Sequence, residues 1–185
     1  MIAPLTRRAV LLGLAASAVA PALADAPPGS ARYIVEIVVF RQPGPLPKPV
    51  PVAPLASVAP IAGRVELLQP HQWQLGAAEQ ALARRGSHPL LAHAAWAAIV
   101  PANGRTTARL EDVLLEGTPL AGSIALQRSQ VLFLSVDIDY LAGPGQVFGL
   151  RERRRVRFGE RHYFDHPAFG IIAQVTPSRG APAAD

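Results

Sequence analysis

The last third of the chain most constrains the fold, because it is a series of short segments rich in β-branched and aromatic residues. Four segments predict successive strands, at residues 123–129, 131–141, 150–158 and 169–175. Short turns around Ser129 and between Ala142 and Gln146 make neighbouring strands antiparallel. The sequence therefore predicts a mainly antiparallel sheet in this part of the chain.

Two earlier segments add a strand and a helix. Residues 33–41, YIVEIVVFR, are apolar on both faces apart from Glu36, which predicts an interior strand. Residues 73–86 predict a helix that ends at Gly86. Its apolar face would consist of Leu75, Ala78 and Leu82.

Two further segments are ambiguous. Residues 88–101, HPLLAHAAWAAIVP, are rich in alanine, which favours a helix, but prolines bound the segment closely. Residues 106–117, TTARLEDVLLEG, predict a short helix or an irregular arm. Taken together, the segments predict an α+β fold: a mainly antiparallel sheet of five or six strands, with one or two helices packed on one face.

The first residues have the composition of a secretory signal peptide. Arg7 and Arg8 precede an apolar run, and the small residues Ala22 and Ala24 form a cleavage site, so residues 1–24 would be removed. The apolar run is too short to span a bilayer comfortably. The arginine pair fits the twin-arginine export route, and the general route is the alternative. We expect a periplasmic mature chain without a membrane span.

Composition divides the mature chain into four parts. Residues 25–32 predict a flexible N-terminal segment, residues 33–177 a single domain, and residues 178–185 a loose tail. A proline-rich insertion at residues 43–60 holds seven prolines and cannot form a sheet or a helix. The composition of this insertion favours an extended surface linker, and the alternative is a docking segment for a partner.

Charge and cysteine content exclude several classes of function. The absence of cysteine excludes disulfides, thiolate metal sites, a cysteine nucleophile and a lipidated N-terminal cysteine. The formal net charge of +5 falls to +3 in the mature chain, because the signal peptide removes two arginines (5 − 2). This modest charge, with the export signal, argues against a nucleic-acid partner.

Residues 162–166 have the pattern H-x-x-D-H, close to the H-x-x-E-H motif of zinc hydrolases. Two histidines four residues apart can share one ion on a helix, but in a strand they lie roughly 13 Å apart. Pro167 biases His166 away from helical geometry, so the motif predicts the end of a strand entering a turn. We assign no metal ligand, cofactor or catalytic residue. The alternative is a wall-active hydrolase with a site around Glu160, His162 and Asp165.

Arginines gather on one face of the strand at residues 150–158: Arg151, Arg153, Arg155 and Arg157. Asp137 and Asp139 lie on one face of the preceding strand. Pairing Leu134 with Val156 would place Asp137 near Arg153 and Asp139 near Arg151. Arg155 and Arg157, together with Arg161, would then be free to bind an anionic ligand.

The C-terminal segment RRVRFGERHYFDHPAFGIIAQVTP resembles the end of the CsiV family, periplasmic proteins described as peptidoglycan-binding. The matching residues are Gly159, Glu160, His162, Tyr163, Phe164, Asp165, His166, Pro167, Phe169, Gly170 and Ile172. Upstream, LLAHAAWA is similar to the family's H-x-A-W element. LAGSIALQRSQVLFLSVDI is similar to its strand pair, although Ala121 stands where an acid is expected. YIVEIVVFR is similar to its first strand, so the resemblance covers most of residues 33–177. It implies that the segment at residues 88–101 is a strand.

The resemblance implies a non-enzymatic envelope protein that binds peptidoglycan and supports cell-wall or cell-shape integrity. An envelope protein of cell-wall synthesis is a candidate partner. Aromatic faces suit sugars and arginine suits carboxylates. The candidate peptidoglycan-binding residues are Arg155, Arg157, Arg161, His162, Tyr163, Asp165 and His166. The alternative is architectural, with Asp165 binding the turn two residues on, the histidines satisfying buried carbonyls, and Tyr163, Phe164 and Phe169 filling the core.

Overall fold

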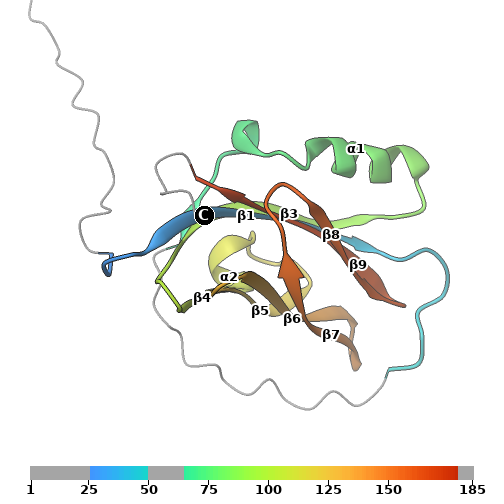
Figure 1. Cartoon of the computed structure of the whole chain (residues 1–185). Helices are drawn as coiled ribbons and strands as arrows, with labels where there is room; N and C mark the ends of the chain where they lie inside the picture. Colours follow the sequence, from blue (N-terminus) through green and yellow to red (C-terminus); the bar gives the residue numbers. More distant parts are fainter. Residues whose placement is uncertain (1–25, 50–64, 179–185) are drawn as a thin grey trace, which may run out of the picture.

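The computed structural model describes residues 26–49 and 65–178, which form two antiparallel sheets that face each other (Figure 1). Sheet A has the strand order β2-β3-β1-β9-β8, and sheet B has the order β4-β5-β6-β7. The predicted signal peptide, most of the proline-rich insertion and residues 179–185 of the predicted tail lie outside the described residues.

Sheet A consists of β1 (Ala31–Arg41), β2 (Glu66–Leu67), β3 (Leu90–Val100), β8 (Arg161–His166) and β9 (Phe169–Pro177). Sheet B consists of β4 (Arg105–Arg109), β5 (Leu120–Arg128), β6 (Leu132–Gly143) and β7 (Gln146–Val156). The helices are the 3-10 turn η1 (Pro70–Gln72), α1 (Gly76–Arg85) and α2 (Leu110–Val113).

The prediction of one sheet with helices on one face is wrong. The described residues form nine strands in two sheets, and α1 covers the face of sheet A that points away from sheet B (Figure 1). Period-2 alternation indicates that a strand has one apolar face, but it does not say which strands share a sheet. Strands β2 and β4 were not predicted. Strand β8 was not separated from β7, but a turn at residues 157–160 divides the two in the Arg-rich segment.

Other elements agree with the sequence. Strand β1 is interior, between β3 and β9, and Gly86 ends α1 in the left-handed conformation with φ of 66°. Residues 90–100 form a strand despite their alanines. Ala94 and Trp96 enter the core between the sheets, whereas Ala95 is buried on the opposite face, so packing on both faces overrides helix propensity. Residues 106–117 hold both the short helix α2 and most of β4.

The core lies between the inner faces of the two sheets. Trp96, Phe164 and Phe169 are its largest fully buried side chains, and the ring of Tyr140 on β6 meets that of Phe169 on β9 at 5.9 Å between centroids. Burying each such side chain contributes about 1.5–3 kcal/mol. This contact joins β6 to β9, the neighbours of β7 and β8, which carry the candidate site.

Arg154 bridges the two sheets where β7 approaches β8. Its guanidinium lies over the ring of Phe164, 4.9 Å from the centroid, and its Nη1 donates a hydrogen bond to the carbonyl oxygen of Tyr163 at 2.8 Å. Glu152 accepts hydrogen bonds from the same guanidinium. An arginine of sheet B therefore donates a hydrogen bond to a backbone carbonyl of β8, an edge strand of sheet A.

A buried ion pair attaches the α1 segment to sheet A. His93 Nε2 lies 2.8 Å from Glu36 Oε1, and His93 Nδ1 lies 2.7 Å from Glu79 Oε2. The Glu36 carboxylate also accepts hydrogen bonds from the backbone N–H groups of Gln74 and Leu75. Both nitrogens of His93 face carboxylates, which only accept, so the doubly protonated ring satisfies this arrangement.

Within residues 26–49 and 65–178, no helix has the length and apolar character needed to cross a membrane.

Candidate binding site

The hairpin of β6 and β7 carries the predicted arginine face, but its register differs from the prediction by two residues. Val156 lies opposite Leu132 rather than Leu134, and Asp137 lies opposite Arg151 rather than Arg153. A slip of two residues keeps every side chain on its own face, whereas a slip of one would reverse them. The prediction of a shared exposed face is therefore correct for Arg151, Arg153 and Arg155, whereas Arg157 lies beyond the end of β7.

Arg151 is the arginine that pairs with both acids. Its Nε lies 3.1 Å from Asp137 Oδ1, and its Nη2 lies 2.9 Å from Asp139 Oδ1. Gly149 lies opposite Asp139 and leaves room for this pair, because a Cβ there would come within 2.0 Å of Arg151 Nη1. The predicted proximity of Asp139 to Arg151 is confirmed, and the predicted proximity of Asp137 to Arg153 is wrong.

Arg153 is engaged differently. Its guanidinium carbon lies 3.9 Å from the centroid of the Phe133 ring, and its Nη2 donates a hydrogen bond to Gln127 at 3.2 Å. Arg155 lies directly opposite Phe133 and forms no ion pair with any residue in the described ranges. Of these two arginines, Arg155 is thus the one available to a ligand.

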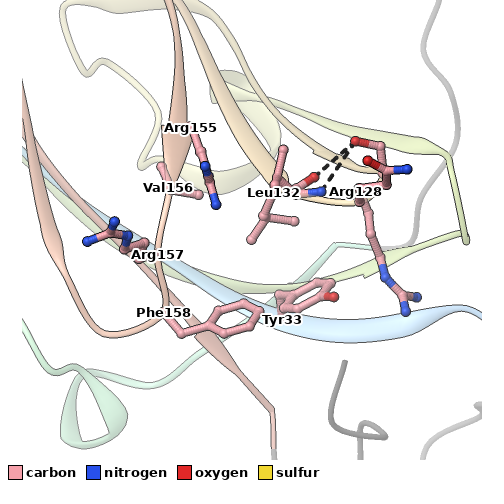
Figure 2. A pocket seen from close by; sticks show the side chains of 10 residues that line it. Tyr33, Arg128, Leu132, Arg155, Val156, Arg157 and Phe158 are labelled. Atoms are coloured by element: carbon pink, nitrogen blue, oxygen red, sulfur yellow. Dashed lines mark hydrogen bonds between the residues drawn. The ribbon is translucent and has the colours of Figure 1, made fainter. Parts of the chain in front are cut away.

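A pocket of about 240 Å³ opens beside Arg155, where one end of sheet B meets the start of β1 (Figure 2). The turn between β5 and β6, the end of β7 and the residues just after β7 surround it. Tyr33 and Phe158 form one wall, with nearly parallel rings 5.6 Å apart between centroids. The exposed Phe158 covers the buried Tyr33, so this wall closes the core at that end.

Three arginines line the pocket: Arg128, Arg155 and Arg157 (Figure 2). Arg128 Nη1 donates a hydrogen bond to the carbonyl oxygen of Gly29 at 2.7 Å, which fixes that side chain. Arg157 Nη1 lies 3.4 Å from Glu160 Oε1 in an exposed pair. No acidic side chain of the described residues lines the pocket itself, so its electrostatic character is cationic.

Strand β8 divides the remaining predicted site residues between its two faces. Arg161, Tyr163 and Asp165 alternate with Phe164, which is fully buried in the core. Tyr163 is 43% exposed, so the expectation that it fills the core is wrong. Its ring stacks on Phe40 at 6.2 Å between centroids.

The polar groups of Tyr163 and Asp165 form one cluster with Gln42, outside the core. The hydroxyl of Tyr163 donates to Asp165 Oδ1 at 2.8 Å, and Gln42 Nε2 donates to both, at 2.6 Å to Tyr163 and 2.7 Å to Asp165. Burial and this hydrogen bond to Asp165 raise the pKa of Tyr163. The cluster combines an aromatic face with hydroxyl, amide and carboxylate groups, which suits a polar ligand.

The two histidines of the H-x-x-D-H pattern each bind a backbone N–H group. His162 Nε2 accepts from Arg157 at 3.3 Å, and His166 Nδ1 accepts from Ala168 at 3.0 Å. His166, not Asp165, therefore makes the predicted contact with the turn two residues on, and neither histidine has the predicted role of binding a carbonyl. Burial lowers the pKa of His166, which the nearby Asp165 offsets only in part.

The predicted site residues consequently lie in separate places. Arg155 and Arg157 line the pocket, and His162 supports the backbone of Arg157. Tyr163 and Asp165 lie on the other face of β8 from His162. Glu160, His162 and Asp165 do not converge on one point, because Asp165 is three residues from His162 in a strand and Glu160 pairs with Arg157. In the described ranges, no group of three or more histidines and acids is arranged to hold a metal ion.

Sequence patterns did not indicate Tyr33, Arg128 and Phe158 as site residues. Tyr33 lies in the segment that predicts an interior strand, and Phe158 is an apolar residue of the predicted strand at residues 150–158. Arg128 lies next to Ser129, where a turn was expected, and this location was the one available signal. Contact between the two sheets, which local patterns do not report, brings the three side chains together.

One comparison with known proteins gives a match. The family model described as "Peptidoglycan-binding protein, CsiV" matches residues 57–178, about two thirds of the chain. The match begins after β1, so it does not include the resemblance seen at residues 33–41. No curated protein and no solved structure matches the chain significantly.

Proposed function

The chain belongs to the CsiV family, and we propose that it is an exported, non-enzymatic envelope protein that binds peptidoglycan. In this proposal the N-terminal signal peptide directs the chain to the periplasm, by the general or the twin-arginine route. Binding there supports cell-wall or cell-shape integrity, alone or with an envelope protein of cell-wall synthesis.

The pocket beside Arg155 and Arg157 is the observation that carries the proposal. It combines an aromatic wall with arginines, and peptidoglycan combines sugars, which pack on aromatic faces, with peptide carboxylates, which pair with guanidinium groups. The match of the family model includes every lining residue except Tyr33.

The remaining candidate residues have supporting parts in the proposal. Tyr163 and Asp165, with Arg161 on the same face of β8, form a second contact for hydroxyl and amide groups of the polymer. His162 and His166 hold the backbone on either side of these residues. A polymer can contact both places at once, because it extends beyond one pocket.

A pull-down with purified sacculi tests the proposal. The double variant Arg155→Gln and Arg157→Gln should bind sacculi more weakly than the parent at low salt, and high salt should reduce the difference, because screening acts over about 8 Å near physiological ionic strength. Arg153→Gln is the matched control, since Arg153 is equally charged but does not line the pocket. Parent protein that stays in the supernatant at low salt contradicts the proposed function.

A further inference from the structure

We propose that the pocket binds the peptide part of peptidoglycan through a carboxylate, with Arg128 as a specificity-determining residue beside Arg155 and Arg157. This inference rests on the proposed function and states which chemical part of the polymer occupies the pocket. It concerns Arg128, which sequence patterns did not single out.

The charge of the lining selects an anionic group. Three arginines line the pocket and no acidic side chain of the described residues does. The glycan strands of peptidoglycan, with each lactyl group joined to a peptide through an amide, carry no ionised group, whereas the peptides carry free carboxylates. A neutral sugar would leave Arg128 and Arg155 without a counter-charge, since among the three arginines only Arg157 has an ion-pair partner in the described residues, Glu160. The peptide is therefore the part of the polymer that the charges fit.

The geometry of Arg128 suits a carboxylate. Its Nη1 is fixed by the Gly29 carbonyl oxygen at 2.7 Å. A guanidinium has five N–H donors in a rigid fork, so this one hydrogen bond leaves further donors for a ligand. Because the side chain is already held in place, less conformational entropy is lost on binding.

Arg157 and the aromatic wall complete the site. The pair of Arg157 and Glu160 is exposed at 3.4 Å and contributes little free energy, so a ligand carboxylate can replace Glu160. The Phe158 ring is 45% exposed over Tyr33 and offers an apolar surface to the aliphatic part of an amino-acid residue. The arginines would thus bind the charged end and the aromatic wall would bind the side chain.

The volume of the pocket is compatible with the end of a peptide. The pocket volume of about 240 Å³ is well above the minimum that holds a single water. This space admits the end of a short peptide. The polymer would enter the pocket by a peptide terminus, with its glycan outside.

Competition for sacculus binding tests the inference with three soluble probes. The first is a peptidoglycan stem peptide with free carboxylates, and the second is the same peptide with its carboxylates amidated. The third is glycan chains freed of peptide, with the lactyl carboxylates that this exposes also amidated so that the chains stay uncharged. The free peptide should displace the parent protein from sacculi, and the other two probes should not do so at the same concentration. Displacement by glycan but not by peptide overturns the inference and leaves the proposed function standing, whereas a parent that does not bind sacculi refutes the proposed function itself.

Titration calorimetry with the free peptide tests the part of Arg128. Arg128→Gln should weaken peptide binding about tenfold or more, because a hydrogen bond to a charged group is lost. Arg128→Lys keeps the charge but loses the fork and should weaken it less, and Arg153→Gln should leave it unchanged. A melting temperature for each variant separates lost binding from lost folding. A folded Arg128→Gln variant with the parent's affinity overturns the assignment of Arg128.

Discussion

His93 and Glu36 form an ion pair inside the protein, with His93 Nε2 at 2.8 Å from Glu36 Oε1 and both side chains only 3% exposed. The pair joins β3 to β1, and Glu36 in turn binds the two backbone N–H groups that precede α1. Burial alone would lower the pKa of His93 and raise that of Glu36. Hydrogen bonds outweigh burial in both, so the pKa of His93 is raised and that of Glu36 is lowered.

This pair predicts a pH-dependent stability. A raised His93 pKa contributes stability that is fully present below about pH 6.5 and is lost as pH rises through the folded value. A lowered Glu36 pKa contributes stability that is present above about pH 4.3 and is lost as pH falls through the folded value. His93→Gln should therefore lower the free energy of unfolding most between these limits, by about 3 kcal/mol.

Urea denaturation at about pH 5.5 and about pH 8.5 measures this effect. The gap between parent and His93→Gln should be larger at the lower pH. His71→Gln is the control, because His71 is exposed and makes no such pair with a described residue. An equal gap at both pH values would show that His93 acts as a neutral core residue.

Phe164 and Phe158 should respond differently to truncation. Phe164 is fully buried and lies under Arg154, so Phe164→Ala should cost about 3–5 kcal/mol of unfolding free energy. Phe158 is exposed, so Phe158→Ala should lower the free energy of unfolding by less. It should nevertheless weaken binding to sacculi, because it removes part of the aromatic wall. Urea denaturation and the sacculus pull-down together check this, and equal losses of stability would contradict the assignment of Phe158 to the pocket surface.

Gly170 lies beneath the rings of Phe40 and Tyr163. A Cβ there would come within 2.7 Å of Phe40 Cζ and 2.9 Å of the Tyr163 hydroxyl. Gly170→Ala should therefore displace both rings and lower the free energy of unfolding by about 1–3 kcal/mol. Near-ultraviolet circular dichroism and thermal melting measure the change. Gly76→Ala is the control, because its Cβ would meet nothing within 4 Å, and a silent Gly170→Ala would mean that the rings adjust freely.

Arg161 separates the two proposed contacts with peptidoglycan. It lies on β8 with Tyr163 and Asp165, and it does not line the pocket. Arg161→Gln should weaken sacculus binding but leave calorimetric binding of the free stem peptide unchanged, whereas Arg155→Gln should weaken both. If Arg161→Gln also loses binding of the free peptide, the pocket and the contact on β8 belong to one site.

The sequence predicted which side chains share a face better than which strands share a sheet. The arginine face of β7 follows from alternation alone, and a two-residue slip of register did not disturb it. Asp139 was predicted as a neighbour of Arg151, but Asp137 was not. The exact register depends on the turn between Leu141 and Gln146, where the ladder is irregular. The pocket could not be predicted either, because Tyr33 and Phe158 meet only when the two sheets pack together.

The contact of Arg154 with the Tyr163 carbonyl also bears on self-association. A strand at the edge of a sheet presents unpaired carbonyl and N–H groups, which can recruit a strand from another chain and begin aggregation. At β8, the guanidinium of Arg154 donates a hydrogen bond to one such carbonyl, that of Tyr163, and covers the adjacent Phe164 ring. The same side chain that bridges the layers thus leaves one carbonyl fewer on this edge for a strand of a neighbouring molecule.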